Sequence, residues 1–206
     1  MAAIHLPERC GVMLLPDCTL FPHGVLPLRI FEPRYRRMLA DALEGDCLFA
    51  VANLRGEETA CPADSVHPVG TIGLVRASHE LDDGTSQLLL HGVLRVWFSD
   101  WPGGRDYPFA EIRPVESNPL PDHEAAAAML RLRRTVANAL EAMPAEIRTA
   151  VWTIFDRAQD PELLCDLIAQ QLIHQPDVRH ELLSAPCVKT RIAMLHDQLR
   201  RMTKPG

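Results

Sequence analysis

Lysine is almost absent from this chain of 206 residues, and the two lysines that occur, Lys189 and Lys204, exclude one class of enzyme. A P-loop needs glycines ahead of a Lys-Ser or Lys-Thr pair, because backbone amides must surround the phosphates. No glycine occurs in the five residues before Lys189, and Lys204 is followed by Pro205. The sequence therefore predicts no P-loop ATPase and no ATP hydrolysis. A Ser-Lys peptidase dyad would have to use one of the same two lysines.

Long apolar runs and patterned cysteines are also missing. No stretch approaches the ~18 apolar residues of a membrane span, and residues 1–10 lack the apolar core of a signal peptide. The cysteines form no CxxC pair, which indicates free thiols in a reducing compartment; they are Cys10, Cys18, Cys47, Cys61, Cys165 and Cys187. We therefore expect a cytoplasmic protein without membrane contact, cofactor or metal site.

Catalytic patterns are missing as well. The serines lack the GxSxG turn of a nucleophile elbow, and the nine histidines lack the close paired spacing of metal ligands. The adjacent carboxylates of Glu57-Glu58 and Asp82-Asp83 are typical of solvated turns rather than of an acid/base pair. The sequence therefore provides no catalytic residue, although a hydrolase with an unrecognised site stays open as an alternative.

Charge is divided unevenly along the chain. Residues 1–117 hold ten arginines, no lysine and sixteen acids, a net charge of −6, whereas residues 118–206 have a net charge of zero. A nucleic-acid-binding domain is usually basic, and an acidic half repels a phosphate backbone. The charge pattern thus argues against a nucleic-acid partner.

Two local basic patches stand out against this background. The first is Arg131, Arg133 and Arg134, and the second is Arg200, Arg201 and Lys204. Each is consistent with a solvated helix face or with contact to an anionic partner, and the sequence leaves both alternatives open.

The chain changes character near Ser117–Pro121. Glycines and short β-like runs occur before this point, whereas only the terminal Gly206 is a glycine after it. The change predicts two domains, 1–117 and 118–206, joined by a proline-marked hinge near Asn118–Pro121.

The first domain is predicted to be a small closed or half-closed barrel with one early helix. Pro33 fits the first turn of a helix and Gly45 its end, with apolar residues on one face between them. Asp83-Gly84 is a turn signal before a run with period two. Strands are expected at residues 12–16, 26–31, 47–54, 69–75, 87–98 and 107–113.

The second domain is predicted to be a helical bundle. Apolar stripes run from Met129 to Met143 and, after Pro144, from Ile147 to Ala158. Asp160-Pro161 is an N-cap followed by proline at the first helical position. Further helices are expected around residues 161–172, 178–183 and 188–202, and each apolar stripe needs a partner. The expected fold class is therefore α+β.

Several segments of the chain are similar to segments of one known family: Leu20-Phe21-Pro22-His23-Gly24, Pro27-Leu28, Ile30-Phe31-Glu32-Pro33-Arg34-Tyr35, Val69-Gly70-Thr71-Ile72-Gly73 and Leu90-His91-Gly92-Val93-Leu94-Arg95-Val96. Through them nearly the whole chain, and most specifically residues 13–49, resembles the N-terminal substrate-binding domain of ATP-dependent Lon proteases. The resemblance implies a PUA-like β pseudo-barrel followed by a helical bundle. Because no P-loop follows, it also implies a stand-alone form without the ATPase and peptidase modules.

The resemblance implies a non-catalytic module that binds unfolded or extended polypeptide, as an adaptor in protein quality control with a protease or chaperone as partner. An RNA-binding PUA-like module is the alternative from another class, which the acidic first half disfavours.

The expected binding surface comprises a turn and the start of the following helix. Its members are Leu20, Phe21, His23, Arg34, Arg36 and Arg37. In the competing interpretation, which stays open here, Leu20 and Phe21 pack inward and the arginines only solvate the helix.

Overall fold

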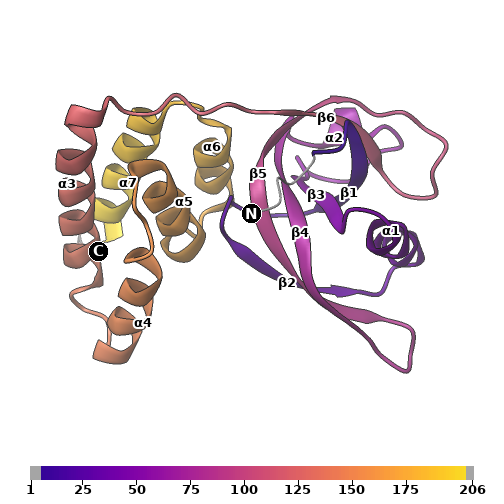
Figure 1. Cartoon of the computed structure of the whole chain (residues 1–206), viewed down its shortest axis with the longest axis horizontal. Helices are drawn as coiled ribbons and strands as arrows, with labels where there is room; N and C mark the ends of the chain where they lie inside the picture. Colours follow the sequence, from indigo (N-terminus) through magenta and orange to yellow (C-terminus); the bar gives the residue numbers. More distant parts are fainter. Residues whose placement is uncertain (1–5, 203–206) are drawn as a thin grey trace. The chain divides into compact units, whose positions relative to one another are not determined.

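The chain divides into two compact units, Met1–Val115 and Glu116–Gly206, in the computed structural model of Figure 1. The structure describes residues 6–202. A mixed six-stranded sheet with two helices forms the first unit, and helices form the second. We call them the barrel unit and the helical unit. This segregation of strands and helices confirms the predicted α+β class.

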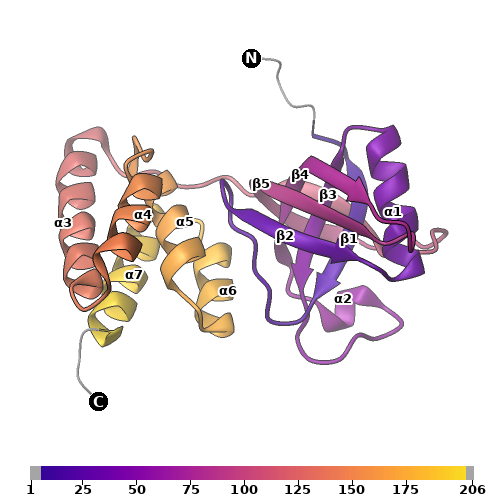
Figure 2. The same ribbon diagram turned by 90° about the horizontal axis from the view of Figure 1, so that it is seen from below.

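The barrel unit is a ring of five strands with a sixth strand attached. Its elements are β1 (Arg9–Leu15), β2 (Val25–Ile30), α1 (Pro33–Glu44), β3 (Leu48–Asn53), α2 (Pro62–Ser65), β4 (Val69–Glu80), β5 (Ser86–Asp100) and β6 (Phe109–Pro114). The strand order is β2-β5-β4-β3-β1-β6, and β5 also pairs with β6, which closes the ring. The first half of β5 pairs instead with β2, so that β2 lies outside the ring, as Figure 2 shows.

Both faces of the sheet carry a core. Val12, Ala50, Ile72 and Val96, one from each of four neighbouring strands, are fully buried in the cluster inside the ring. The second cluster lies under α1, which buries Tyr35, Met38 and Leu39. Because β3 is covered on both sides, all six of its residues are buried.

Local sequence accounts for α1. Pro33 is its first residue, where the missing N–H costs nothing, and Gly45 follows its last residue. Its three buried residues recur at i, i+3 and i+4, the spacing of one helix face. The Tyr35 hydroxyl accepts a hydrogen bond from the backbone N–H of Leu14 at 3.1 Å, which anchors the helix to β1. The predicted helix is thus confirmed with its expected boundaries.

The Asp83-Gly84 turn joins β4 and β5 into the long hairpin seen in Figure 1. Gly84 has φ +73°, a conformation that glycine adopts without strain. The Asp83 carboxylate accepts hydrogen bonds from the N–H and hydroxyl of Thr85, at 2.9 and 2.7 Å, and these bonds lower the pKa of Asp83. The turn signal in the sequence therefore predicted the hairpin correctly.

The helical unit is organised around one central helix. Its elements are α3 (Asp122–Leu140), α4 (Ala145–Phe155), α5 (Pro161–Leu172), α6 (Pro176–Ser184) and α7 (Val188–Met202). The central helix α5 packs against the other four. Asp160 caps α5 as predicted, because its carboxylate accepts from the N–H of Leu163 at 2.9 Å.

Two further features complete the fold. The short helix α2 was not predicted, because four residues in a proline-rich and acidic loop carry no periodicity. Within residues 6–202, no helix combines the length and the apolar character needed to cross a membrane.

We propose that the two units are separate domains, and expect glutamyl endopeptidase to cut the folded chain first after Glu57 and Glu116. Residues 55–61 form an exposed run, and Glu116 is exposed at the boundary between the units. Exposed backbone outside regular structure is the preferred site of nicking. The fragments would be identified by mass spectrometry. First cuts within α3 or α6, after Glu124 or Glu181, would contradict this division.

Candidate functional site

The edge strand β2 presents one apolar face to solvent. Among the described strands it pairs only with β5. Leu26, Leu28 and Ile30 point toward the core under α1. Because successive side chains of a strand alternate between faces, Val25 and Pro27 must point the other way, and both are exposed.

Three rows of residues cross β2, β5 and β4 on this outward face. The rows are Val25, His91 and Leu74; Pro27, Leu89 and Ala77; and Arg29, Gln87 and His79. We call these nine residues the open sheet face. Its second and third rows line a groove of about 480 Å³. At the centre Leu89 remains 44% exposed, and in the first row Val25 remains 49% exposed.

The open sheet face is apolar at its centre and polar at one end. Arg29 at that end pairs with Asp83 at 3.3 Å. In the first row, burial lowers the pKa of His91, and the charges of Arg76 and His23 act in the same direction. A lowered pKa leaves the His91 imidazole neutral at neutral pH. The first two rows of the open sheet face therefore carry no charge at that pH. Such a surface suits apolar side chains of a ligand.

The outer edge of β2 is suited to limited strand pairing. Pro27 has no N–H to donate, and proline in a sheet is confined to edges or bulges. Its position in the middle of β2 therefore both marks the edge and interrupts the row of donors that another strand would use. Side-chain burial, more than a continuous ladder of hydrogen bonds, would hold an extended segment here.

Two members of the expected binding surface are buried. Leu20 is 1% exposed and Phe21 is 0% exposed, so neither side chain can contact a ligand in this fold. Leu20 packs with Tyr35 and Met38 in the core under α1, and its carbonyl accepts a 2.6 Å hydrogen bond from the Thr71 hydroxyl. The expectation that they line a surface was wrong, because their turn is pressed against β5 and β4.

His23 is exposed, at the end of that same turn. Its φ is +62°, and its N–H donates to the carbonyl of Gly92 at 2.8 Å. The imidazole meets the ring of His91 edge-on, with the ring centroids 6.5 Å apart. The structure thus brings His23 to the first row of the open sheet face.

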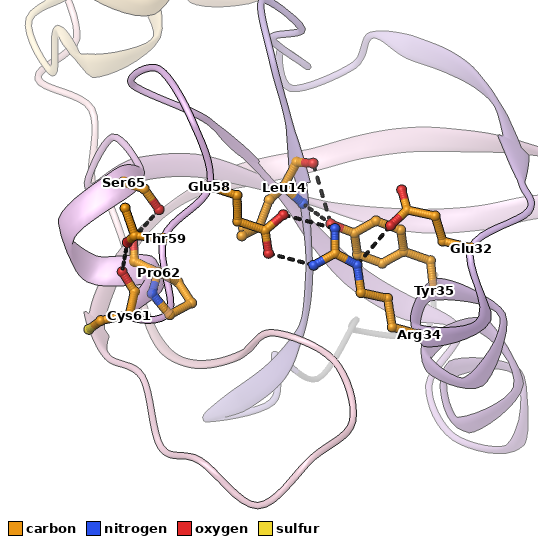
Figure 3. Close-up of polar contacts among 9 residues, drawn as sticks. All are labelled: Leu14, Glu32, Arg34, Tyr35, Glu58, Thr59, Cys61, Pro62 and Ser65. Carbon is orange, nitrogen blue, oxygen red and sulfur yellow. Dashed lines mark hydrogen bonds and ion pairs between the residues drawn. The ribbon is translucent and has the colours of Figure 1, made fainter.

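Arg34 is held within the barrel unit by two acids, as Figure 3 shows. Its Nε donates to Glu32 at 2.8 Å, and its two terminal nitrogens form a bidentate pair with Glu58, one of them at 2.8 Å. The bond to Glu58 raises the pKa of Arg34 further. The guanidinium also lies 4.6 Å from the centroid of the Tyr35 ring. Arg34 therefore connects α1 to the loop that contains Glu58.

The other two arginines differ in what they contact. Arg37 is exposed and pairs with Asp41 at 3.2 Å. A 2.8 Å hydrogen bond from the Tyr107 hydroxyl lowers the pKa of Asp41. Arg36 is exposed and lies against Gly84, where its guanidinium occupies the space of a Cβ. Of the six expected residues, His23, Arg36 and Arg37 are exposed and Arg34 is half-buried and ion-paired; the binding role of these four stays a prediction.

Sequence reasoning missed Leu89, Pro27 and Ala77. One signal was available, since Leu88, Leu89 and Leu90 are consecutive in a strand of period two. When Leu88 and Leu90 face the core, Leu89 must face away from it. No group of three or more potential metal ligands occurs within residues 6–202.

Comparison with known proteins identifies one family. Residues 9–201 match the family model described as the ATP-dependent protease La (LON) substrate-binding domain. "Lon protease 2" of Syntrophobacter fumaroxidans is 29% identical over 195 residues, which is 93% of this chain and 24% of that protease. "Lon protease 2" of Herpetosiphon aurantiacus is 29% identical over 188 residues, 89% of this chain and 23% of that protease. The chain thus spans about a quarter of the length of these relatives.

Solved structures show the same fold. The N-terminal domain of the Mycobacterium avium complex Lon protease superimposes with a TM-score of 0.72 at 18% identity, covering 94% of this chain and 98% of that one. A Lon N-terminal domain protein from Xanthomonas campestris gives a TM-score of 0.64 at 17% identity, covering 91% and 96%. Because the family model covers almost the whole chain, the resemblance noted in the sequence is confirmed, and the chain belongs to the family of Lon substrate-binding domains.

Proposed function

We propose that the barrel unit binds extended polypeptide on the open sheet face, without a covalent step. One observation carries the proposal: Leu89 lies between Pro27 and Ala77 on a solvent-facing sheet and is 44% exposed at the centre of an apolar row. Exposed apolar surface of this kind, bordered by polar residues, is typical of an interaction site. The family's substrate-binding designation supports the same role.

The chemistry of the surface predicts broad recognition. Apolar side chains of a client would pack on Leu89 and Val25, while Arg29 and Gln87 bound the groove at its polar end. Because Pro27 interrupts the row of backbone N–H donors on β2, main-chain pairing with a client would be limited. Binding would then depend on few features of the client's sequence. Binding of this kind is weak and tolerant of sequence, as capture of unfolded chains requires.

We further propose that the protein serves as a non-catalytic adaptor in protein quality control, delivering clients to a protease or chaperone in the cytoplasm. The six cysteines are free in the structure, which is consistent with a reducing compartment. Site-specific crosslinking from Leu89 or Val25 would identify the clients that contact the open sheet face.

The Leu89→Gln variant of the full chain is expected to bind fluorescently labelled, unfolded casein about fivefold more weakly than the wild type. Burying the exposed part of one leucine contributes about 1 kcal/mol to binding. The measurement is fluorescence anisotropy. Leu43→Gln is the matched control, because Leu43 lies on α1 and is also 44% exposed; its affinity should be unchanged.

An Arg37→Glu variant tests the surface on α1 in the same assay. Unchanged binding by Leu89→Gln together with a loss in Arg37→Glu would move the site to α1 and overturn the proposal. Equal losses in Leu89→Gln and Leu43→Gln would show that exposed apolar area in general, and not the open sheet face, binds the client.

A further inference from the structure

The two basic patches of the helical unit meet at one pocket. Arg131 and Arg134 of α3 lie opposite His196 and Arg200 of α7, around a pocket of about 440 Å³. Thr135, Asn138 and Leu199 complete its lining. Because α3 packs on α7, residues some 65 positions apart form a single basic concavity.

Helix periodicity explains the arrangement. Residues 131, 134, 135 and 138 recur at the i, i+3, i+4 and i+7 spacing of one helix face, and residues 196, 199 and 200 do the same on α7. A hydrogen bond of 2.8 Å joins the Thr135 hydroxyl to Nδ1 of His196 across the two helices. The same hydroxyl lies 3.2 Å from the Arg131 carbonyl, to which it can donate while it accepts from a protonated Nδ1. In that arrangement Nε2 of His196 is the nitrogen that gains a proton when the ring becomes charged.

Arg131 and Arg134 of this pocket differ from three other arginines of the helical unit. Arg133, Arg148 and Arg179 donate to backbone carbonyls within the bundle. Arg131 and Arg134 form neither a hydrogen bond through their side chains nor an ion pair with any residue between 6 and 202. Like charges three or four residues apart on a helix destabilise it. A pocket that gathers such charges without an acid in its lining is suited to a ligand that neutralises them.

We propose that this pocket binds a phosphate-class oxyanion. The planar forks of Arg131 and Arg134 can donate two parallel hydrogen bonds each, which matches the oxygens of a tetrahedral anion. Arg200, from the facing helix, adds positive charge on the opposite wall, and Asn138 offers a neutral donor. A concave wall formed by two helices favours a compact, multiply charged group over the flat side of a macromolecule. This site is separate from the open sheet face and does not depend on the function proposed for it.

Binding at this site should be coupled to protonation of His196. Burial lowers the pKa of His196, and the charges of Arg200 and Arg131 lower it further, whereas Asp197 opposes them. An anion in the pocket offsets the arginine charges and raises the pKa again. The complex therefore takes up a proton, and affinity increases as the pH falls toward the pKa of the anion-free protein.

The test uses the full chain with sulfate and pyrophosphate, at constant ionic strength maintained with chloride. Calorimetry should show saturable binding of pyrophosphate that Arg131→Gln and Arg134→Gln each weaken about tenfold. Arg157→Gln removes the same charge from an exposed position of the helical unit and should change the affinity less than about twofold. Sulfate, whose charge is constant between about pH 5.5 and 8, should bind more tightly at the lower pH.

A second measurement follows His196 by NMR. Saturating sulfate should move the titration of His196 to higher pH. Equal losses in all three arginine variants, or identical titrations of His196 with and without sulfate, would overturn the proposal. Tight binding of an oligoribonucleotide without binding of pyrophosphate would overturn it as well, in favour of a nucleic-acid surface.

Discussion

The Arg191→Met variant is expected to lower the free energy of unfolding of the helical unit by about 3–5 kcal/mol, because it removes the guanidinium that faces the buried Asp166 carboxylate. The Arg191 side chain is 1% exposed, and Asp166, 2% exposed, lies 3.8 Å from it. Arg191 also pairs with Glu162 at 3.1 Å. Methionine matches the aliphatic stem of arginine as far as Nε, so the loss combines the missing charge and hydrogen bonds with the space that the guanidinium leaves.

Arg191 also joins segments that are distant in sequence. Its Nε donates to the Ala185 carbonyl at 2.7 Å, and Nη2 donates to the Ser117 hydroxyl at 2.6 Å and to the Pro186 carbonyl at 3.2 Å. The connection between α6 and α7, the first residues of the unit and α5 therefore meet at one guanidinium. Lysine, with a single nitrogen, cannot replace this set of donors.

Urea denaturation followed by circular dichroism at the helix band measures the effect. The exposed Arg201 lies on the same helix, so Arg201→Met is the matched control and should cost less than about 1 kcal/mol. Adding Asp166→Asn to Arg191→Met should recover part of the loss, because it removes the buried negative charge that Arg191 faced. A fully stable Arg191→Met variant would show that the buried network contributes nothing net to stability.

The Gly92→Ala variant should destabilise the barrel unit by about 3 kcal/mol, because overpacking against a fixed backbone cannot be relieved by a rotamer change. A Cβ at this position would lie 2.1 Å from the Phe21 carbonyl oxygen. Two backbone hydrogen bonds join the turn to β5 at this point. The N–H of His23 donates to the Gly92 carbonyl at 2.8 Å, and the N–H of Gly92 donates to the Gly24 carbonyl at 2.9 Å. The turn would have to lift away and expose Leu20.

Fluorescence in a Trp152→Phe background reports on this unit, because the remaining tryptophans, Trp97 and Trp101, belong to the barrel. Gly103→Ala is the control, since a Cβ added to Gly103 would have no neighbour within 4 Å and its φ lies outside the left-handed region. That variant should be neutral or slightly more stable. If Gly92→Ala unfolded at the same urea concentration as Gly103→Ala, the turn would be more mobile than its two hydrogen bonds indicate.

Local interactions made much of the fold predictable from the sequence. Pro33 and Gly45 bound α1, Asp160 caps α5, and Asp83-Gly84 turns β4 into β5, each through contacts within a few residues. The period-two pattern predicted β5 for the same reason, because alternation is a property of the strand itself. The family resemblance rests on segments of this kind.

Contacts between residues distant in sequence determine which residues of the candidate sites are exposed, and no local sequence pattern predicts these contacts. Glu58 binds Arg34 across 24 positions, a partner that no local pattern around Arg34 predicts. Leu20 lies in a segment with the composition of a surface turn, yet its side chain is buried because this segment packs against β4 and β5. Leu89 is exposed because the pairing of β5 with β2 and β4 places its side chain on the sheet face opposite α1. Each outcome depends on which elements pack together, because burial and ion pairing are settled by tertiary neighbours and not by sequence spacing.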